Sequence, residues 1–378
     1  MFEKIKYRLL GVFILQIASI YLYLSKSSST SPLRNYQQDR DTLAVKSINA
    51  GNRDKLRDVL KDKKSTPIHR SSINKGSNSE PYETKATKNP PPQDVNFLIN
   101  NPNICTNSSG MKYIVYVHSA PENTARRHLL RSTWLNTTFF TDRIMRAVFV
   151  FGRSNSSEVQ ANIETEAERY GDIIQGDFID TYRNLTLKAV LGLKWVTAYC
   201  KEASILIKVD DDAFVNIFKL FNLLRSYEGS RRTIVCLLYK EKSMPILRDP
   251  LTCAKWCVQS EEFPGRDFYP RYCAGLAYIL SIDLVPLLYN ASWSTPFFWI
   301  DDVYVTGLLP QNVEGVRYIS LVANYTFKVS GVIKELKNSH KSLTHIFVHA
   351  PYPSAFMSMW QLLIERTDNG ALSERKLQ

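Results

Sequence analysis

From residue 112 onward, short apolar runs alternate with longer stretches in which apolar residues recur at three- and four-residue spacings. The runs have the length of strands, and the longer stretches have the period of helices. The clearest strands are expected at residues 113–119, 147–152 and 205–210, and the clearest helices at 158–169 and 186–200. Alternation of strands and helices predicts an α/β fold.

The N-terminal end has a different pattern. Residues 7–24 form an apolar run with Gln16 as its main polar interruption, and Lys4, Lys6 and Arg8 lie at its N-terminal side. The run is long enough to cross a thin bilayer, and basic residues on that side predict a cytoplasmic N-terminus. We therefore expect a type II transmembrane signal-anchor. A cleaved signal peptide is the alternative, although no small-residue cleavage site follows the run.

The next segment, residues 25–104, is polar and rich in Ser, Lys and Pro, with no sustained apolar period. Such a segment cannot bury enough surface to offset the entropy lost on ordering, so we interpret it as a stem. The expected organisation is a cytoplasmic tail (1–6), a transmembrane signal-anchor (7–24), a disordered stem (25–104) and a lumenal domain (105–378).

The formal net charge of +12 and the pI near 9.3 raise the question of a nucleic-acid partner. Lys and Arg are spread along the whole chain, and no basic stripe with interleaved aromatic residues is present. Nucleic-acid sites concentrate their positive charge, so we interpret the surplus as a solvated basic surface and expect no nucleic-acid partner.

All six cysteines lie beyond residue 100, and only Cys253 and Cys257 are close together in sequence. A zinc site usually takes two such pairs, so disulfides are the better interpretation. Six Asn-X-Ser/Thr sequons lie in the same region, and we expect glycans on Asn107, Asn136, Asn155, Asn290 and Asn324. The sequons and the even number of cysteines together indicate an oxidising, glycosylating lumen.

One disulfide can be predicted from position. Cys105 stands just before the first expected strand and Cys200 just before the strand at 205–210, so a bridge between them would tie the start of the domain to that strand. The remaining cysteines allow three pairings, among which the sequence does not choose: Cys236, Cys253, Cys257 and Cys273.

The strongest chemical signal is the acidic cluster Asp210-Asp211-Asp212, which directly ends an apolar run. In an open α/β sheet, ligands bind outside the carboxyl ends of the strands. Adjacent carboxylates repel one another and favour a hard cation, Mn²⁺ or Mg²⁺, that bridges to a diphosphate. A solvated acidic turn is the alternative, and the apolar strand before the cluster favours the metal site.

A second acidic pair, Asp301-Asp302, follows an aromatic run at 296–300. Carboxylates packed beside aromatic rings have a raised proton affinity, which suits a general base that takes a proton from a hydroxyl group. A helix N-cap is the alternative interpretation of the pair.

Five segments follow one another along the chain: RRHLLRSTW (126–134), DFIDTYRNLTLKAVLGLKWVTAYC (177–200), IKVDDDAFVN (207–216), YPRYCAGLAYILS (269–281) and DDVYVTG (301–307). In this order they resemble the motifs of glycosyltransferase family thirty-one, the β-1,3-galactosyltransferase and β-1,3-N-acetylglucosaminyltransferase group. The resemblance spans about residues 105–365 and leaves out the stem. It implies a GT-A fold, which is a Rossmann-like sheet that binds a nucleotide-sugar at its strand ends, and inversion at the anomeric carbon.

The resemblance also implies roles for single residues. Asp210 and Asp212 match the D-x-D motif, in which the last carboxylate holds the metal and the first lies near the donor ribose. His349 matches a histidine near the chain end that reaches the metal. Asp302 matches the aspartate that acts as the base. A lone histidine after an apolar run is more often structural, so the assignment of His349 depends on the resemblance.

The donor side of the site is implied in the same way. Arg127 and Arg131 match the R-x-x-x-R spacing of the first motif, where their charge could balance the diphosphate; exposed helix arginines are the alternative. The nucleotide pocket is expected to include Asp177, Tyr182, Asn184, Asp210 and Asp211. Asn184 is also a sequon, and a residue that lines the pocket would not carry a glycan.

Two departures from the family pattern fall on the expected acceptor side. Where the family has a C-x-G-x-G turn, this chain has Cys273-Ala-Gly275-Leu-Ala277, so Ala277 replaces the second glycine. Tyr272, directly before the turn, and Gly275 within it are the expected acceptor-side residues. Asp301 stands where glutamate is usual. Neither change removes a catalytic group, so we expect an active enzyme.

The expected function is transfer of galactose or an N-acetylhexosamine from a UDP-sugar to the 3-hydroxyl group of a glycan acceptor on lipid or protein. The enzyme would act at the Golgi membrane, alone or in a homo- or hetero-oligomer. The alternative hypothesis is that the chain is a non-catalytic lumenal carbohydrate-binding relative with the same fold. Joint retention of the Asp210-Asp212 pair, Asp302 and His349 argues against this alternative, because a pure binder has no use for a base. No motif fixes the donor sugar or the acceptor.

Overall fold

The computed structural model describes residues 92–106, 110–139, 145–249, 253, 256–338 and 343–375. The expected signal-anchor at 7–24, most of the expected stem, and Asn107 lie outside these residues. Within the described part of the chain, no helix combines the length and the apolar character that crossing a membrane requires. All described residues belong to one compact unit.

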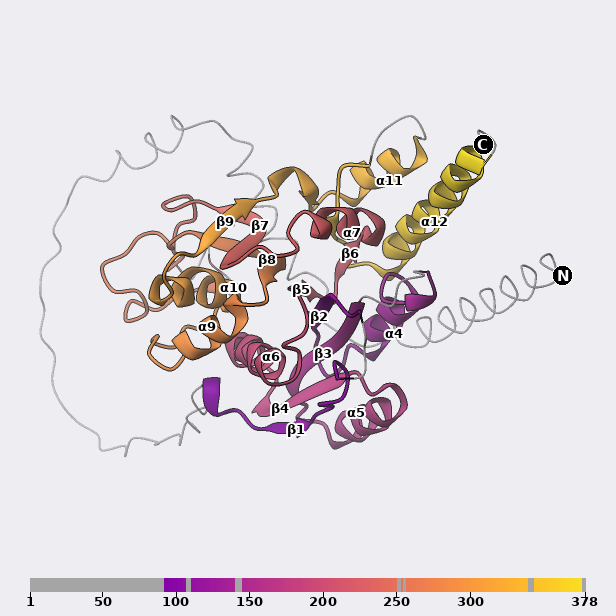
Figure 1. Cartoon of the computed structure of the whole chain (residues 1–378). Helices are drawn as coiled ribbons and strands as arrows, with labels where there is room; N and C mark the ends of the chain where they lie inside the picture. Colours follow the sequence, from indigo (N-terminus) through magenta and orange to yellow (C-terminus); the bar gives the residue numbers. More distant parts are fainter. Residues whose placement is uncertain are drawn as a thin grey trace, which may run out of the picture. The chain divides into compact units, whose positions relative to one another are not determined.

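Two sheets organise the unit (Figure 1). The strands of the large sheet are β1 (Phe97–Ile99), β2 (Tyr113–His118), β3 (Met145–Arg153), β4 (Ile173–Ile179), β5 (Ile205–Asp210), β7 (Thr233–Tyr239), β8 (Tyr272–Ser281) and β9 (Arg317–Ser320). The small sheet has β6 (Ala213–Val215), β10 (Tyr325–Thr326) and β11 (Phe347–His349).

The helices lie between and beside these strands. The α-helices are α4 (Thr124–Ser132), α5 (Ser157–Tyr170), α6 (Leu185–Tyr199), α7 (Ile217–Arg225), α9 (Leu284–Ala291), α10 (Asp301–Val303), α11 (Val329–Lys337) and α12 (Pro353–Arg375). Shorter helical turns are η1 (Pro92–Asp94), η2 (Thr137–Phe139), η3 (Tyr182–Asn184), η5 (Tyr304–Leu308), η6 (Leu309–Asn312) and η7 (Val322–Asn324).

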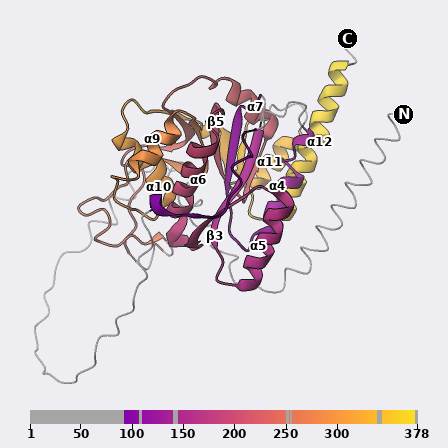
Figure 2. The same ribbon diagram turned by 60° about the horizontal axis from the view of Figure 1, so that its bottom comes forward.

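The large sheet is mixed, with the order β1-β4-β3-β2-β5-β8-β7-β9. Strands β2 to β5 are parallel, so their carboxyl ends meet at one edge, where His118 pairs with Asp210. Strand β8 runs antiparallel to β5 and β7, which brings its first residue, Tyr272, and the end of β7 to the same edge. Helices α6, α9 and α10 lie on one face of the sheet, and α4 and α5 on the other (Figure 2). The α/β prediction is therefore confirmed.

Burial explains why the strands read as continuous apolar runs. Every residue of β2 is buried, and in β5 only Asp210 is partly exposed, as expected for strands covered on both faces. Helix α6 is buried on nearly all sides, which accounts for its weak polar face.

Helix α5 shows how local residues set an element's bounds. The Ser156 hydroxyl accepts a hydrogen bond from the Val159 backbone N–H at its start, which satisfies one of the helix's free donors. Gly171 ends it at a φ of 63°, the left-handed conformation that glycine adopts without a steric penalty. The expected helix at 158–169 is thus present, one residue longer at each end.

The expected stem boundary at residue 104 is wrong. Strand β1 pairs antiparallel with β4, and the Phe97 ring packs against Tyr199 of α6. Lys194 of α6 also donates a hydrogen bond to the Val95 carbonyl (2.8 Å). An edge strand of three residues is too short to show a period of two, so its pattern could not be recognised. The folded domain includes residues 92–104.

Three disulfides lie within the described residues. Cys105 is bridged to Cys200, as the sequence analysis expected. The pairing left open is settled as Cys236–Cys273, which joins β7 to β8, and Cys253–Cys257 in the segment between these strands.

Candidate active site

The carboxyl end of β5 carries the acidic cluster, and a buried lysine lies directly beneath it. The Lys208 ammonium donates hydrogen bonds to Asp210 Oδ1 and to the Gly275 carbonyl, and lies 3.9 Å from Asp301 Oδ2. Burial, and then the charges of Asp212 and Asp301, raise the pKa of Asp210 to about 7, although Lys208 opposes the shift. Part of the positive charge that the cluster requires is therefore supplied by the chain itself.

The middle carboxylate of the cluster is a structural acceptor. Asp211 Oδ2 accepts hydrogen bonds from the Ser119 hydroxyl (2.7 Å) and the Asn123 amide (2.8 Å), and burial raises its pKa. These contacts attach the loop after β2, which leads into α4, to the end of β5. Asp211 thereby holds the loop after β2 in place.

The last carboxylate faces a histidine on another strand. His349 Nε2 lies 3.3 Å from Asp212 Oδ2, because β11 pairs with β6 so that His349 stands opposite Ala213. Burial alone would raise the pKa of Asp212, but the hydrogen bond and charge of His349 outweigh it and lower the pKa. Among the described residues, the buried Asp212 Oδ1 has no hydrogen-bond partner.

A free buried carboxylate oxygen beside an imidazole nitrogen suits a hard divalent cation, since Mn²⁺ takes both oxygen and nitrogen ligands. Of the three expected ligands, Asp210 already accepts a hydrogen bond from Lys208 at Oδ1, and its role as a metal ligand stays a prediction. Across the described ranges, no three His, Cys, Asp or Glu side chains gather closely enough to hold a metal by themselves. Asp212 and His349 fit as its protein ligands, with oxygens of a diphosphate or water completing the shell.

The second acidic pair begins α10 and faces β8. Asp302 is fully buried, and a Cβ atom added at Gly275 would lie 3.0 Å from its Oδ2. Glycine at position 275 is therefore what lets β8 approach this carboxylate so closely. Asp302 Oδ1 accepts a hydrogen bond from the Val303 backbone N–H (2.8 Å), which fixes its orientation.

The other member of the pair, Asp301, lies toward β2. Its Oδ2 is 3.5 Å from His118 Nδ1. Burial, followed by the charges of Lys208 and Lys188, lowers the pKa of His118 well below its ordinary value, so the imidazole is neutral. Asp301 and Asp210 thus share one buried cation, Lys208, which places both acidic pairs at the same edge of the sheet.

The two arginines of the first motif lie beneath the loop after β2. Arg127 is fully buried, forms an ion pair with Glu166 of α5 (2.7 Å) and donates to the Ala120 and Pro121 carbonyls. Arg131 pairs with Glu166 and with Asp172. Their guanidinium groups are occupied by protein acceptors, so their position supports the loop rather than direct contact with a diphosphate.

The second motif is split between surface and interior. Asp177 is half exposed and pairs with Arg153. Asn184 is buried and donates to the Ile179 carbonyl, and the expectation that it carries no glycan stays a prediction. Tyr182, which was expected in the nucleotide pocket, packs instead against Trp256 and Trp299, and Trp299 stands two residues before the second acidic pair.

The expected acceptor-side residue Tyr272 is buried at the start of β8, against Tyr239 and Tyr269. Among the expected glycosylation sites, Asn155 and Asn290 are exposed and Asn136 and Asn324 are partly exposed. Their glycosylation stays a prediction.

Sequence reasoning missed Lys208, His118 and Lys188. Lys188 of α6 donates to the Ser119 carbonyl and to Asp180 Oδ1, and so holds the same loop as Asp211. A signal was present, because a lysine in the middle of a buried apolar run needs a carboxylate partner. Lys208 stands at such a position, two residues before Asp210.

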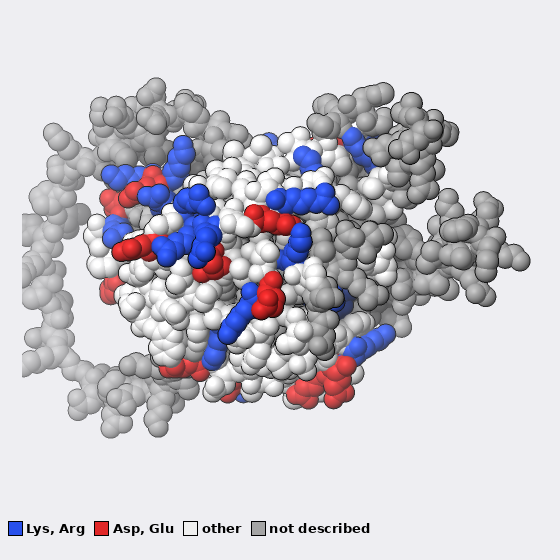
Figure 3. Space-filling model, in the orientation of Figure 1, with Lys and Arg blue, Asp and Glu red and all other residues white. Residues whose placement is uncertain are grey.

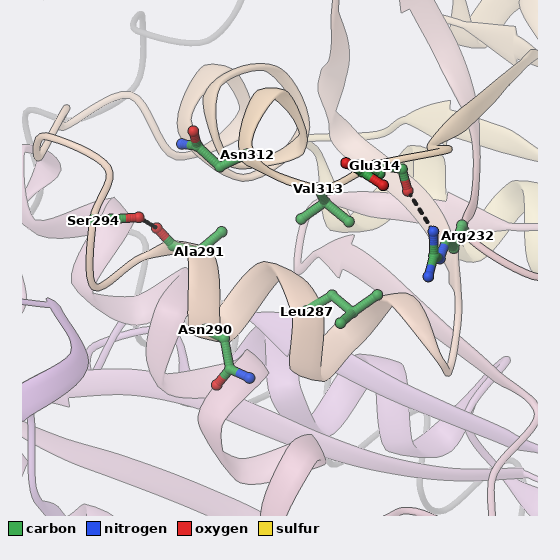
Figure 4. Close-up of a pocket in the computed structure, with 8 residues that line it drawn as sticks. All are labelled: Arg232, Leu287, Asn290, Ala291, Ser294, Asn312, Val313 and Glu314. Atoms are coloured by element: carbon green, nitrogen blue, oxygen red, sulfur yellow. Dashed lines mark hydrogen bonds between the residues drawn. The ribbon is translucent and has the colours of Figure 1, made fainter.

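A cavity of about 380 Å³ lies away from this site, between α9 and the residues that follow η6 (Figure 4). Arg232 at its rim donates to the Glu314 carbonyl (2.9 Å) and directly precedes β7, so the cavity is at the sheet edge opposite the carboxylates.

The surface charges are mixed in sign. On the face in Figure 3, Lys and Arg stand beside Asp and Glu in small groups, which is typical of a solvated surface.

Comparison with known proteins identifies the family. Residues 125–321 match the galactosyltransferase family. β-1,3-Galactosyltransferase 5 of Gorilla gorilla gorilla is 31% identical over 269 residues, which cover 71% of this chain and 87% of the relative. The human protein of the same name is 32% identical, covering 66% of this chain and 77% of its own length. Lactosylceramide 1,3-N-acetyl-β-D-glucosaminyltransferase A of Xenopus laevis is 35% identical over 57% of this chain and 59% of its own.

This chain is therefore a glycosyltransferase that belongs to the galactosyltransferase family, glycosyltransferase family thirty-one. Among solved structures, the galactosyltransferase LgtC in complex with donor and acceptor sugar analogues aligns with 67% of this chain and 95% of its own. The identity is 9% and the TM-score 0.32.

Proposed function

We propose that the chain is an inverting, metal-dependent transferase that moves galactose or an N-acetylhexosamine from a UDP-sugar to the 3-hydroxyl group of an acceptor glycan. The observation that carries the proposal is the pair of separate acidic sites at one sheet edge. Asp212 with His349 forms one, and Asp302 against Gly275 forms the other. An inverting displacement needs this separation, because the leaving group and the attacking hydroxyl lie on opposite sides of the anomeric carbon.

Asp212 and His349 would hold Mn²⁺ or Mg²⁺, and that ion would supply positive charge to the departing diphosphate. Asp210, held by Lys208, would lie toward the donor ribose. Asp211, Arg127 and Lys188 would keep the loop after β2 in place, so that its backbone groups face the nucleotide. This arrangement is the GT-A type of site that the family resemblance implies.

Asp302 would act as the base. It takes the proton of the acceptor 3-hydroxyl group while that oxygen forms its bond to C1 of the donor sugar and the bond from C1 to the diphosphate oxygen breaks. The proton ends on Asp302, and the negative charge leaves with UDP. Its hydrogen bond from Val303 and the absent side chain at Gly275 orient the carboxylate for this transfer.

We further propose a type II protein of the Golgi membrane, anchored by residues 7–24 with the described unit in the lumen. The apolar character of residues 7–24 supports the anchor. The sequons and the disulfides support a lumenal location of the described unit. The acceptor would be a glycan on lipid or protein, and the enzyme could work as a homo- or hetero-oligomer.

The test is a donor screen on the chain from residue 90 onward. UDP-galactose, UDP-N-acetylglucosamine and UDP-N-acetylgalactosamine are each supplied with Mn²⁺ and a panel of p-nitrophenyl glycosides, and UDP release is measured. We expect release with one donor, loss with EDTA, and a fall of about 10² to 10⁴ in kcat for Asp302→Asn. Product NMR should show a β-1,3 linkage. Full turnover in Asp302→Asn would rule out Asp302 as the base. Full turnover in the presence of EDTA would rule out metal dependence.

A further inference from the structure

Three aromatic rings from separate segments pack together next to α10. Trp299, two residues before Asp301, lies against Tyr182 of η3 (5.9 Å between ring centroids) and against Trp256 (6.3 Å, rings 16° from parallel). Tyr182 and Trp256 meet edge to face at 4.9 Å. We call Tyr182, Trp256 and Trp299 the aromatic wall.

The members of the wall differ in exposure. Trp299 is only 2% exposed and belongs to the core, whereas Tyr182 and Trp256 are each partly exposed. The ring surface that a ligand can reach is therefore supplied by Trp256 and Tyr182. Large aromatic rings that stay partly exposed next to catalytic groups are typical of ligand sites.

Arg183 adds a polar rim to the wall. Its guanidinium lies 4.0 Å above the Trp299 ring, donates to the Cys257 carbonyl (3.2 Å) and pairs with Glu262 (3.6 Å). The side chain is 48% exposed, so donors on its outer side remain accessible to water or a ligand. An apolar ring surface with charged groups at its border matches the two kinds of surface on a pyranose, which has a C–H face and a rim of hydroxyl groups.

The disulfide Cys253–Cys257 anchors Trp256. The bridge spans a sequence separation of only 4, and closing so short a loop restricts the unfolded chain much less than a long one. The main effect of the bridge is local, because it fixes Cys257, the residue next to Trp256. Arg183 also donates a hydrogen bond to the Cys257 carbonyl. The bridge and Arg183 together hold Trp256 against Trp299.

The aromatic wall lies on the side of Asp302 rather than on the side of Asp212 and His349. Tyr182 follows β4 at the edge where Asp210 ends β5, and the Thr186 hydroxyl of α6 donates to the Phe298 carbonyl (2.6 Å), directly before Trp299. Helices α6 and α10 share one face of the sheet (Figure 2). His349, in contrast, lies in β11 of the small sheet, opposite Ala213 of β6, and Asp212 directly precedes β6.

We propose that the aromatic wall is the acceptor-sugar subsite, with Trp256 as the ring against which the C–H face of the acceptor pyranose packs. The Cys253–Cys257 bridge and Arg183 are positioning groups for this ring. The inference rests on the proposed function, since only a transferase with Asp302 as its base requires an acceptor sugar beside this helix.

The test separates acceptor from donor. With p-nitrophenyl β-galactoside, β-N-acetylglucosaminide and α-N-acetylgalactosaminide as probes, Trp256→Ala should raise the acceptor KM about tenfold, the loss of one ring contact. The KM of the UDP-sugar and acceptor-independent UDP release should not change. Trp256→Phe should stay close to wild type, and Cys253→Ser/Cys257→Ser should raise the acceptor KM in the same direction. Trp293→Ala is the matched control, because Trp293 is 57% exposed and stands outside the wall.

A binding measurement makes the inference independent of turnover. The same glycosides should quench tryptophan fluorescence saturably in the wild type and not in Trp256→Ala, with the folded state checked by circular dichroism. The inference is overturned by absent quenching in the wild type, by an unchanged acceptor KM in Trp256→Ala, or by an equal rise in the donor KM. Absence of transfer with saturable quenching would instead count against the proposed function alone.

Discussion

At the residue scale, Gly275 and Asp302 depend on each other. The closest approach of an added Cβ to Asp302 Oδ2 is 3.0 Å, a contact tighter than side chains normally make. Gly275→Ala should therefore shift the carboxylate and lower kcat by about 100-fold, the cost typical of misplacing a reacting group by about 1 Å. UDP release kinetics measure this effect.

A matched control is available in α11. A Cβ at Gly331 meets no atom within 4 Å, so Gly331→Ala should leave kcat unchanged. Equal kcat in both variants would contradict the close packing of Gly275 against the base.

Asp212 carries the second prediction at this scale. Its Oδ1 has no hydrogen-bond partner among the described residues and its pKa is lowered, so it is ionised and available to a cation. Asp212→Ala should abolish Mn²⁺-dependent binding of UDP, measured by calorimetry with and without Mn²⁺. The control is Asp94→Ala, which removes an exposed carboxylate in η1, and this variant should bind UDP as the wild type does. Unchanged Mn²⁺ dependence in Asp212→Ala would remove it as a ligand.

The acidic residues of the site could be predicted from the sequence, because they stand directly after an apolar strand and in motif order. Their partners could not. Lys208 and His118 are single polar residues inside apolar runs, and which carboxylate each one faces depends on the register between β2 and β5. The arginines show the same limit, since Glu166 lies on a helix whose packing the sequence does not specify.

At the element scale, α4 and α5 are held together by one buried carboxylate. Glu166 accepts from Arg127 and Arg131, and although burial alone would raise its pKa, these hydrogen bonds and charges lower it below 4.5. A carboxylate with a lowered pKa contributes stability above its unfolded value, and the contribution is lost as the pH falls through the folded value. The ion pairs therefore stabilise the fold at neutral pH and not in strong acid.

Glu166→Gln should reduce the free energy of unfolding by about 3 kcal/mol at pH 7, because it leaves Arg127 buried without its charged partner. Urea titrations at a series of pH values should show the difference from wild type shrinking below pH 4.5. Glu168→Gln, an exposed glutamate on the same helix, should show little difference at any pH. A pH-independent effect at Glu166 would mean that the loss is one of packing and not of charge.

At the scale of the whole molecule, three of the parallel strands, β2, β3 and β5, were predicted from the sequence, and the edge strands of the large sheet were not. Strands β2, β3 and β5 are long and buried, so each gives a continuous apolar run. Strand β9 has a mixed burial pattern over four residues, and β1 has three residues, so neither gives a periodic signal. Pairing partners distant in the chain, such as β7 with β9, are set by the packing of the whole unit.

The residue at which the folded unit begins can be tested by truncation. The polar sequence pattern predicts a stem that ends at residue 104, whereas η1 packs against α6 and β1 pairs with β4. A secreted chain beginning at residue 90 keeps both elements, and we expect it to be monodisperse and to release UDP as the full chain does. A chain beginning at residue 105 keeps the Cys105–Cys200 bridge but loses β1, which exposes the unpaired edge of β4. It should therefore unfold at a lower temperature and aggregate. Light scattering and thermal unfolding compare the two chains, and identical behaviour would show that β1 is dispensable and that the original boundary was adequate.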